Sequence, residues 1–225
     1  MRVLVLGDGL LGWEIIQQTN WNFLSRKKDN IDVTKFKNWS HLLFGYDVVV
    51  NCIAHTDTYS KEKEIHWEVN YRFVEKLTKF CNKKEIKLVH ISTDYIYTNS
   101  IENATESDVP VHLPTWYGYT KLLGDAHVQL KSKNYLICRL SHKPNPFPYD
   151  KGWVDIKTNC DYVNVISDLV ITLIERGANG VYNVGTKSKS IYDLALETRD
   201  VEPIDRPDFV PENTTMSLDK LINML

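Results

Sequence analysis

The amino-terminal segment joins a short apolar run to a glycine-rich turn and a helical pattern. Val3–Leu6 is a continuous aliphatic run, which is typical of a strand buried on both faces. It leads directly into Gly7-Asp8-Gly9-Leu10-Leu11-Gly12, and apolar residues at helical spacing follow. Glycines in such a turn let the backbone approach a pyrophosphate closely, and the helix N-terminus offers it free N–H groups. The segment therefore predicts a nucleotide-binding unit, with a plain glycine-rich turn as the alternative.

Further strands and helices alternate along the chain as far as residue 140. Buried strands are predicted at 21–25, 47–54, 87–92 and 135–140, where aliphatic and β-branched residues cluster. Long helices are predicted at 62–80, with an apolar stripe from Ile65 to Phe80, and from Thr115 onward. Strands that alternate with helices predict an α/β fold with a doubly wound, Rossmann-like parallel sheet.

Polar residues that follow the predicted strands are candidates for a binding site, because open α/β sheets bind ligands at the carboxyl ends of their strands. His55-Thr56-Asp57 and Thr93-Asp94 follow two of these strands. A carboxylate at the end of the second strand would bind the ribose hydroxyl of NAD. The chain instead has Ser25-Arg26-Lys27-Lys28 at this position. A hydroxyl followed by cations favours the additional phosphate of NADP, although a solvated basic turn has the same composition. Asp32 is a candidate cap for the next helix.

Tyr117 and Lys121 lie four residues apart in a predicted helix that begins near Thr115. This spacing puts both side chains on one face of the helix. An ammonium beside a phenol favours the phenolate, so we expect Lys121 to lower the pKa of Tyr117. Tyr117 would then be a proton donor near neutral pH. The spacing also occurs by chance, so its significance depends on its place in the chain.

The composition argues against several other classes of protein. The formal net charge of −2 disfavours general binding to nucleic acids or membrane surfaces. The seven histidines show no ligand spacing, so we predict no metal site. The four cysteines form no CxxC pair and are expected to be reduced, as in a cytoplasmic protein. No apolar run is long enough for a membrane span or a signal peptide, so we expect a soluble protein.

The sequence changes its character after Ser141. The segment 142–148 is rich in proline and cannot form a helix. A helix is predicted at 163–176, a short strand at 180–185, and helices at 190–198 and 217–225. We expect residues 1–141 to form the nucleotide-binding domain, with 163–185 packed back on it. Residues 142–225 are expected to form a reduced substrate-binding part.

Several phrases of the sequence resemble the extended short-chain dehydrogenases/reductases, and among them the dTDP-4-dehydrorhamnose reductases. Arg139-Leu140-Ser141 is similar to the Arg-Thr-Ser of that family. The resemblance is good from residue 1 to about residue 141 and patchy beyond it. The Ser-Thr-Asp-Tyr phrase combined with Tyr-Gly-x-Thr-Lys is more specific than either alone. The other matching phrases are Val50-Asn51-Cys52-Ile53-Ala54-His55-Thr56, Val69-Asn70, His90-Ile91-Ser92-Thr93-Asp94-Tyr95-Ile96-Tyr97 and Tyr117-Gly118-Tyr119-Thr120-Lys121-Leu122.

The resemblance implies a reductase that uses NADPH, or NADH, on a nucleotide-linked 4-keto-6-deoxy sugar. Tyr117 would give a proton to the ketone oxygen, Thr93 would bond the same oxygen, and Lys121 would hold the nicotinamide ribose. Asn70, otherwise a surface residue, would be a buried structural or proton-relay residue. The candidate substrate contacts are Asp94, Tyr95 and Trp153, with a plain core or surface position as the alternative for Trp153. The implied cofactor contacts are Gly7, Gly9, Leu10, Leu11, Gly12, Ser25, Arg26, Asp32, Val33, Cys52, Ala54, Thr56, Tyr117, Lys121 and Arg139.

The sequence departs from the family pattern in three ways. The glycine turn is one residue shorter than the usual GxxGxxG, the segment between Ser141 and Tyr162 is short, and the chain is shorter than typical members. The substrate could therefore be smaller, or a partner subunit could complete its pocket. Two alternatives stay open, a non-catalytic NADP-binding regulatory or scaffold subunit and a sugar-nucleotide epimerase. The three catalytic candidates favour an enzyme, and the resemblance also implies a homodimer.

Overall fold

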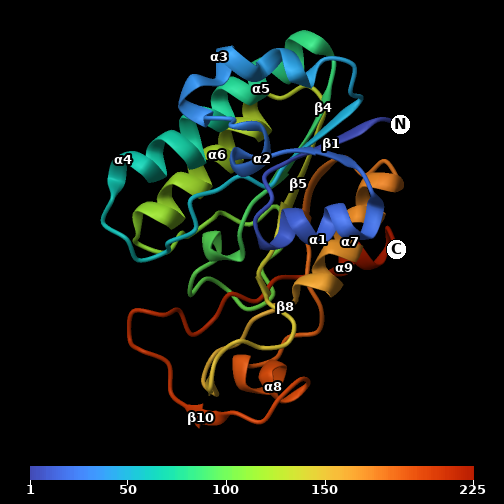
Figure 1. Ribbon diagram of the computed structural model, residues 1–225. Helices are drawn as coiled ribbons and strands as arrows, with labels where there is room; N and C mark the ends of the chain where they lie inside the picture. Colours follow the sequence, from blue (N-terminus) through green and yellow to red (C-terminus); the bar gives the residue numbers. More distant parts are fainter.

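Six parallel strands form the central sheet of the computed structural model, which describes residues 1–225 (Figure 1). Every neighbouring pair of strands in this sheet is parallel, which confirms the predicted doubly wound α/β fold. In spatial order the strands are β2 (Asn22–Leu24), β1 (Val3–Leu6), β3 (Val48–Asn51), β4 (Lys87–Ile91), β5 (Tyr135–Arg139) and β9 (Gly180–Asn183).

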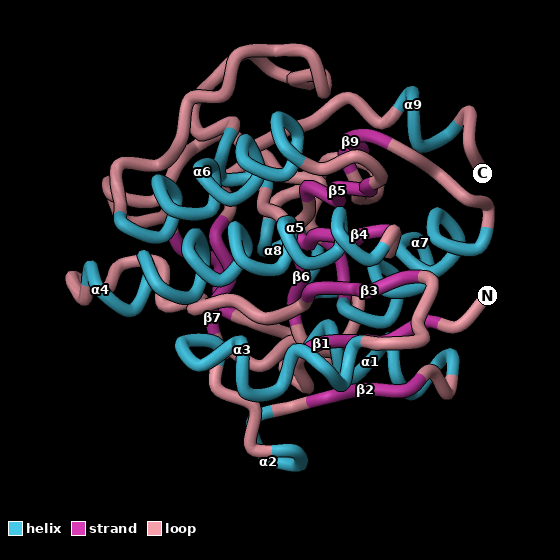
Figure 2. Tube along the Cα trace, turned by 90° about the horizontal axis from the view of Figure 1, so that it is seen from above, coloured by secondary structure: helices cyan, strands magenta, loops and turns pink.

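Helices cover both faces of the sheet (Figure 2). One face packs against α1 (Leu10–Thr19), α7 (Val163–Glu175) and α9 (Asp219–Ile222). The other packs against α3 (Phe36–Trp39), α5 (Phe73–Lys84) and α6 (Trp116–Lys131). Successive residues of β1 point to opposite cores, Val3 and Val5 toward α1 and Leu4 and Leu6 toward α5. This alternation explains why the whole strand is apolar.

Short elements connect the strands. Between β2 and β3 lie α2 (Arg26–Asp29), η1 (Val33–Lys35) and η2 (Ser40–Leu43), and η4 (Asp94–Ile96) follows β4. The long segment from 97 to 115 contains no regular helix or strand, in agreement with the loop that its polar, proline-containing sequence indicates. None of the helices combines the length and apolar character that crossing a membrane requires.

The helix before β4 contains a π-helical segment that the apolar periodicity did not predict. α4 (Lys63–His66) continues through η3 (Trp67–Arg72), which is a π-helix, into α5. A π-turn holds an extra residue, so it rotates the preceding side chains around the helix axis. Ile65, predicted on the apolar stripe, is therefore 40% exposed, and His66 and Asn70 are buried instead.

The C-terminal part lies beyond the end of the sheet, in the lower half of Figure 1. It contains two small parallel pairs, β6 (His142–Lys143) with β8 (Asp161–Tyr162) and β7 (Lys151–Trp153) with β10 (Glu202–Ile204), together with α8 (Ile191–Leu196). Phe147, Ile156 and Leu194 belong to its own apolar core. By contrast α7 and β9, although they lie at residues 163–183, pack with the central sheet.

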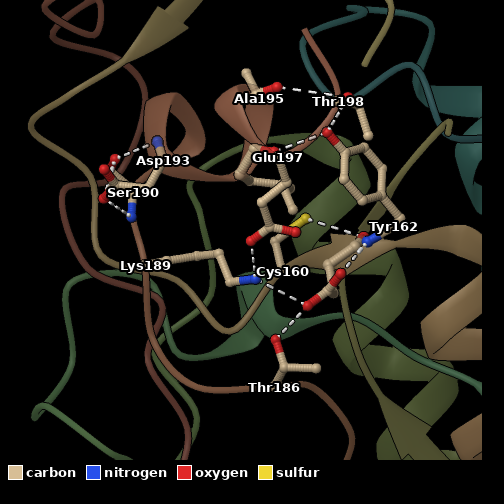
Figure 3. A network of polar contacts seen from close by, with 11 residues as sticks. Cys160, Tyr162, Thr186, Lys189, Ser190, Asp193, Ala195, Glu197 and Thr198 are labelled. Carbon is tan, nitrogen blue, oxygen red and sulfur yellow. Dashed lines mark hydrogen bonds and ion pairs between the residues drawn. The ribbon is translucent and has the colours of Figure 1, made fainter. Parts of the chain in front are cut away.

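A polar network fastens α8 to β8 (Figure 3). Lys189 Nζ donates hydrogen bonds to Asp161 Oδ2 at 3.0 Å and to Glu197 Oε1 at 2.7 Å. The Tyr162 hydroxyl donates to the carbonyl oxygen of Leu194 at 2.7 Å. Ser190 begins α8 with a reciprocal capping box. These bonds join α8 to β8 in addition to the apolar contacts of this part.

Candidate active site

A cleft of about 490 Å³ lies at the carboxyl ends of β1, β3, β4 and β5. It includes the point between β1 and β3 where the strand order reverses, which is the usual ligand position in such sheets. The structure thus brings the glycine turn and the three catalytic candidates to one place. The predicted site residues that line the cleft are Gly9, Leu10, Leu11, Gly12, Cys52, Ala54, Thr56, Thr93, Asp94, Tyr95, Tyr117 and Lys121.

The glycine turn leaves room for a ligand at the start of α1. Gly7 has a φ of +95°, which glycine adopts without strain, and a Cβ on Gly12 would lie 2.1 Å from the carbonyl oxygen of Gly7. At Gly9, in contrast, a Cβ would meet no atom within 4 Å. Gly9 also caps α1 without any side-chain hydrogen bond, so the first N–H groups of the helix stay free. These features fit the pyrophosphate of a dinucleotide.

Tyr117 and Lys121 enter the cleft from the first turns of α6. Thr115 caps this helix by accepting a hydrogen bond from the Gly118 N–H at 3.1 Å, so Tyr117 and Lys121 lie one turn apart and face the cleft. Lys121 Nζ donates to the carbonyl oxygen of Ile91 at 2.5 Å, which ties α6 to the end of β4. Thr93 follows β4 and lines the same cleft.

Burial controls the acidity of the tyrosine and the lysine. Loss of hydration raises the pKa of the Tyr117 phenol to about 12, with hydrogen bonding from Thr93 acting in the opposite direction. The expected lowering of this pKa by Lys121 is therefore wrong for the free protein. Burial also lowers the pKa of Lys121 to about 8, while Asp125 and Cys52 favour its charged form. Both Tyr117 and Lys121 thus carry their protons near pH 7.

Arg139 does not reach the cleft, contrary to the cofactor contact that the resemblance implied. Its buried guanidinium donates to the two carboxylate oxygens of Asp125 at 3.0 and 3.1 Å, and also to the Tyr97 hydroxyl. These bonds engage all three guanidinium nitrogens within the protein. Asp125 lies one helical turn after Lys121, so the ion pair fixes α6 to β5 and supports the position of Tyr117.

Trp153 also lies outside the cleft, so the structure does not bring it together with the other predicted site residues. The residue belongs to β7 and packs, half-buried, against the apolar core of the C-terminal part. The physical reason is the course of the chain after β5, which places Lys143, Pro144 and Tyr149 at the cleft instead.

Four of the implied cofactor contacts, Ser25, Arg26, Asp32 and Val33, lie at or after the end of β2 and do not line the cleft. Ser25 is buried and its Oγ accepts a hydrogen bond from the Lys28 N–H at 3.1 Å. Arg26 is exposed and makes no ion pair. Asp32 is the predicted cap, because its Oδ1 accepts from the N–H and the hydroxyl of Thr34. Gly7 likewise does not line the cleft.

The structure adds cleft residues that the sequence reasoning missed. Most of them follow β5 and belong to the chain that crosses into the C-terminal part. The rule already applied to β3 and β4 could have found them, because β5 ends at the same edge of the sheet. The proline-rich composition after Ser141 obscured that signal. The added residues are Thr58, Ile91, Ser92, Leu140, Ser141, His142, Lys143, Pro144 and Tyr149.

Asn70 is buried and holds the loop that follows β3. Its Oδ1 accepts a hydrogen bond from the His55 N–H at 2.8 Å, and its Nδ2 donates to the His55 carbonyl oxygen at 3.0 Å. This agrees with the structural role that the resemblance implied and not with a surface position. The bidentate contact positions the loop that carries Ala54 and Thr56 to the cleft.

Comparisons with known proteins find reductases among the proteins that this chain resembles. The chain is 34% identical over 116 residues to "Probable low-salt glycan biosynthesis reductase Agl14" of Haloferax volcanii, which covers 49% of this chain and 38% of that protein. It is 34% identical over 100 residues to the dTDP-4-dehydrorhamnose reductase of Salmonella typhimurium, covering 42% of this chain and 32% of that protein. The matched regions thus span well under half of these relatives.

The fold is similar to that of a dTDP-4-dehydrorhamnose reductase from Bacillus anthracis solved in complex with NADP. The TM-score is 0.83 at 19% sequence identity, and the likeness covers 99% of this chain and 91% of that chain. The family described as "RmlD substrate binding domain" matches residues 1–142. Because this match covers more than half of the 225 residues, the chain belongs to the RmlD substrate binding domain family.

Proposed function

We propose that the protein is an NADPH-dependent reductase of a nucleotide-linked 4-keto-6-deoxy sugar, similar to the dTDP-4-dehydrorhamnose reductases among its relatives. One observation carries this proposal. Thr93, Tyr117 and Lys121 line the same cleft as a glycine turn whose open helix N-terminus fits a dinucleotide. A protein that only binds a dinucleotide has no need of a phenol that can act as a general acid.

The cofactor would supply the hydride, and the side chains of the cleft would supply the proton and the electrostatic support. Tyr117 keeps its proton at neutral pH, so it is ready to protonate the ketone oxygen as negative charge develops there. The Thr93 hydroxyl is the candidate donor to the same oxygen. The Lys121 ammonium, anchored on the Ile91 carbonyl oxygen, would bind the nicotinamide ribose and stabilise the phenolate that remains.

The preference for NADPH is assigned to Arg26. It is an exposed cation at the end of β2 that makes no close ion pair, although its charge helps to lower the pKa of Asp32, so its guanidinium can pair with a ribose phosphate. We expect Arg26→Ala to lower kcat/KM for NADPH by about tenfold and to leave that for NADH nearly unchanged. Steady-state kinetics with both cofactors measures this ratio, and an equal loss with NADH would argue against the assignment.

The test of the function is a cofactor-oxidation assay with a panel of dTDP- and UDP-linked 4-keto-6-deoxy sugars. The proposal predicts net oxidation of NADPH with at least one of them. Binding of NADPH without oxidation by any sugar would favour a regulatory or scaffold subunit. Conversion of a sugar without net consumption of cofactor would indicate an epimerase. The homodimer stays a prediction, which light scattering of the purified protein tests.

A further inference from the structure

Asp94 is buried at the base of the cleft and is surrounded by threonine hydroxyls from three separate segments. Thr93 donates to its Oδ1 at 3.3 Å, while Thr214 and Thr158 donate to its Oδ2 at 2.9 and 3.4 Å. The side chain is only 2% exposed. Both carboxylate oxygens are therefore engaged within the protein, whereas the family resemblance implied a contact with substrate.

Two of these hydroxyls belong to the C-terminal part, and its backbone fixes their positions. The Thr214 N–H donates to the carbonyl oxygen of Lys157 at 3.0 Å, which joins the segments that carry Thr158 and Thr214. The Met216 N–H donates to Asn159 Oδ1 at 2.7 Å and locks the same two segments again. The placement of Thr158 and Thr214 against Asp94 is thus a feature of the folded C-terminal part.

The Thr93 hydroxyl has a single hydrogen to donate. Its oxygen accepts a hydrogen bond from the Tyr95 N–H at 3.2 Å, and its hydrogen is directed toward Asp94. In that orientation the hydrogen is not available to an oxygen bound in the cleft. Turned the other way, the same hydrogen reaches Tyr117, where a hydrogen bond from Thr93 favours the phenolate. An ionised carboxylate can only accept, whereas a protonated carboxyl can donate instead. A protonated carboxyl still has an oxygen that accepts, but it holds the Thr93 hydrogen less strongly than the carboxylate does. The charge on Asp94 therefore shifts the preferred direction of that hydrogen.

We propose that Thr158 and Thr214 are positioning residues that act through Asp94 to set the direction of the Thr93 hydroxyl. By donating to Oδ2 they stabilise the ionised carboxylate, which holds the Thr93 hydrogen away from the cleft. When Asp94 takes up a proton, its hydrogen bond from Thr93 weakens and the Thr93 hydrogen is free to turn toward the cleft. The catalytic consequence rests on the proposed reductase function, whereas the hydrogen-bond arrangement does not.

The ionisation of Asp94 falls in an accessible pH range. Burial raises the pKa of its carboxyl to about 6, and hydrogen bonds from Thr214, Thr93 and Thr158 oppose this rise. The titratable groups that interact with it are Tyr95, Tyr117 and Cys160. Burial raises the pKa of each of these three, so all of them stay neutral near pH 6 and none titrates together with Asp94.

A carboxyl-carbon NMR titration of Asp94 in the cofactor-free protein tests the arrangement directly. Thr214→Val should raise the pKa of Asp94 by about one unit, and Thr158→Val should raise it less because its hydrogen bond is longer. Thr215→Val is the matched control, since this buried neighbour donates to Asn213 Oδ1 at 2.8 Å instead. An unmoved pKa in Thr214→Val, or an equal shift in the control, would overturn the proposal.

The pH dependence of turnover tests the link to catalysis. In the wild type kcat should rise as the pH falls through the pKa of Asp94. Thr214→Val should move this rise in kcat to higher pH, by the same number of pH units as the pKa shift in the NMR titration, with little change in KM. Asp94→Asn should abolish the pH-dependent rise. If the pKa of Asp94 shifts in the NMR titration but the pH dependence of kcat does not, the catalytic link would be overturned. A shifted titration in a protein that oxidises no NADPH would support the arrangement and contradict the reductase function instead.

Discussion

At the residue scale, the chemistry of the cleft depends on the burial of Tyr117, which is partly buried, and of Lys121, which is almost fully buried. Lys121 is 3% exposed, and burial works against charge on both side chains. A reduction needs its acid to be protonated before the hydride arrives, so a raised tyrosine pKa is compatible with the role of Tyr117. The sequence could place both residues on one helix face but could not show their depth, because burial is a property of the tertiary structure.

Replacement of Tyr117 by Phe removes the proton and leaves the ring. We expect turnover to fall by about 10²- to 10⁴-fold, which is the usual contribution of a general acid, while the affinity for NADPH stays nearly the same. Cofactor oxidation measures the first quantity and a fluorescence titration the second. Tyr119→Phe is the control, because Tyr119 lies on the same helix, is 37% exposed and does not line the cleft. Wild-type turnover in Tyr117→Phe would contradict the assignment.

Lys121 should leave a signature in the pH dependence of stability. Its pKa is lowered from 10.5 to about 8 in the folded state, so between these values the unfolded chain holds the extra proton. The free energy of unfolding of the wild type should therefore rise from pH 8 toward pH 10 relative to that of Lys121→Met. Urea denaturation of both proteins at several pH values gives this difference. A difference that is constant across the range would show that Lys121 is not desolvated.

At the scale of the elements, α6 is the part that assembles the site, and the Asp125–Arg139 pair decides where it lies. The two residues belong to α6 and β5, and their side chains are 0% and 2% exposed. Gln129 adds a hydrogen bond to Asp125 Oδ1 at 2.6 Å. A carboxylate buried this deeply needs its partner, because an unpaired buried charge is strongly destabilising. The position of the helix in turn places Lys121 beside the Ile91 carbonyl oxygen.

We expect Arg139→Met to destabilise the protein by about 3 to 5 kcal/mol, because it leaves the Asp125 charge buried without its partner. The matched control is Lys157→Met, which breaks the exposed pair with Glu102 at 2.6 Å and should destabilise the protein far less, because solvent screens that pair. Guanidinium denaturation of the two variants gives both values. Similar losses in the two proteins would mean that the buried pair does not fix α6.

The elements also show which features of the fold could be predicted. The strands and most of the helices followed from apolar runs and periodicity, because each core face of the sheet imposes a local pattern. The π-segment was not predictable in this way, since it depends on tertiary contacts. One such contact is Gly124, where a Cβ would lie 2.5 Å from the carbonyl oxygen of Asn70. Arg139 was misassigned because its partner is set by the packing of α6 on β5, which no local pattern records.

At the scale of the whole molecule, the C-terminal part forms one wall of the cleft. The chain leaves β5 and immediately forms β6, whose residues His142 and Lys143 line the cleft. β6 is paired with β8, with His142 opposite Asp161. Asp161 is in turn held by Lys189 and by the Thr186 hydroxyl. This arrangement was beyond sequence reasoning, because the strands are only two residues long and carry no periodicity.

The polar network around Lys189 should therefore control both the local stability of α8 and the shape of the cleft wall that contacts the substrate. Burial acts to lower the pKa of Lys189, but its hydrogen bonds to Glu197 and Asp161 outweigh this effect and raise it, so the ammonium stays charged. Lys189→Met removes both bonds and should destabilise the C-terminal part by about 1 to 2 kcal/mol. We expect faster hydrogen exchange in α8, unchanged exchange in β4 and β5, and a higher KM for the sugar substrate.

Lys187→Met provides the control for this prediction, because Lys187 is exposed on the same loop and makes no ion pair. Hydrogen-exchange mass spectrometry should leave its α8 as protected as that of the wild type. Faster exchange throughout the central sheet of Lys189→Met would mean that the network stabilises the whole molecule and not the C-terminal part. Unchanged exchange in α8 would show that the apolar core around Leu194 suffices. The expected local loosening instead follows from the small size of that core, which makes charged hydrogen bonds a large share of the stability of this part.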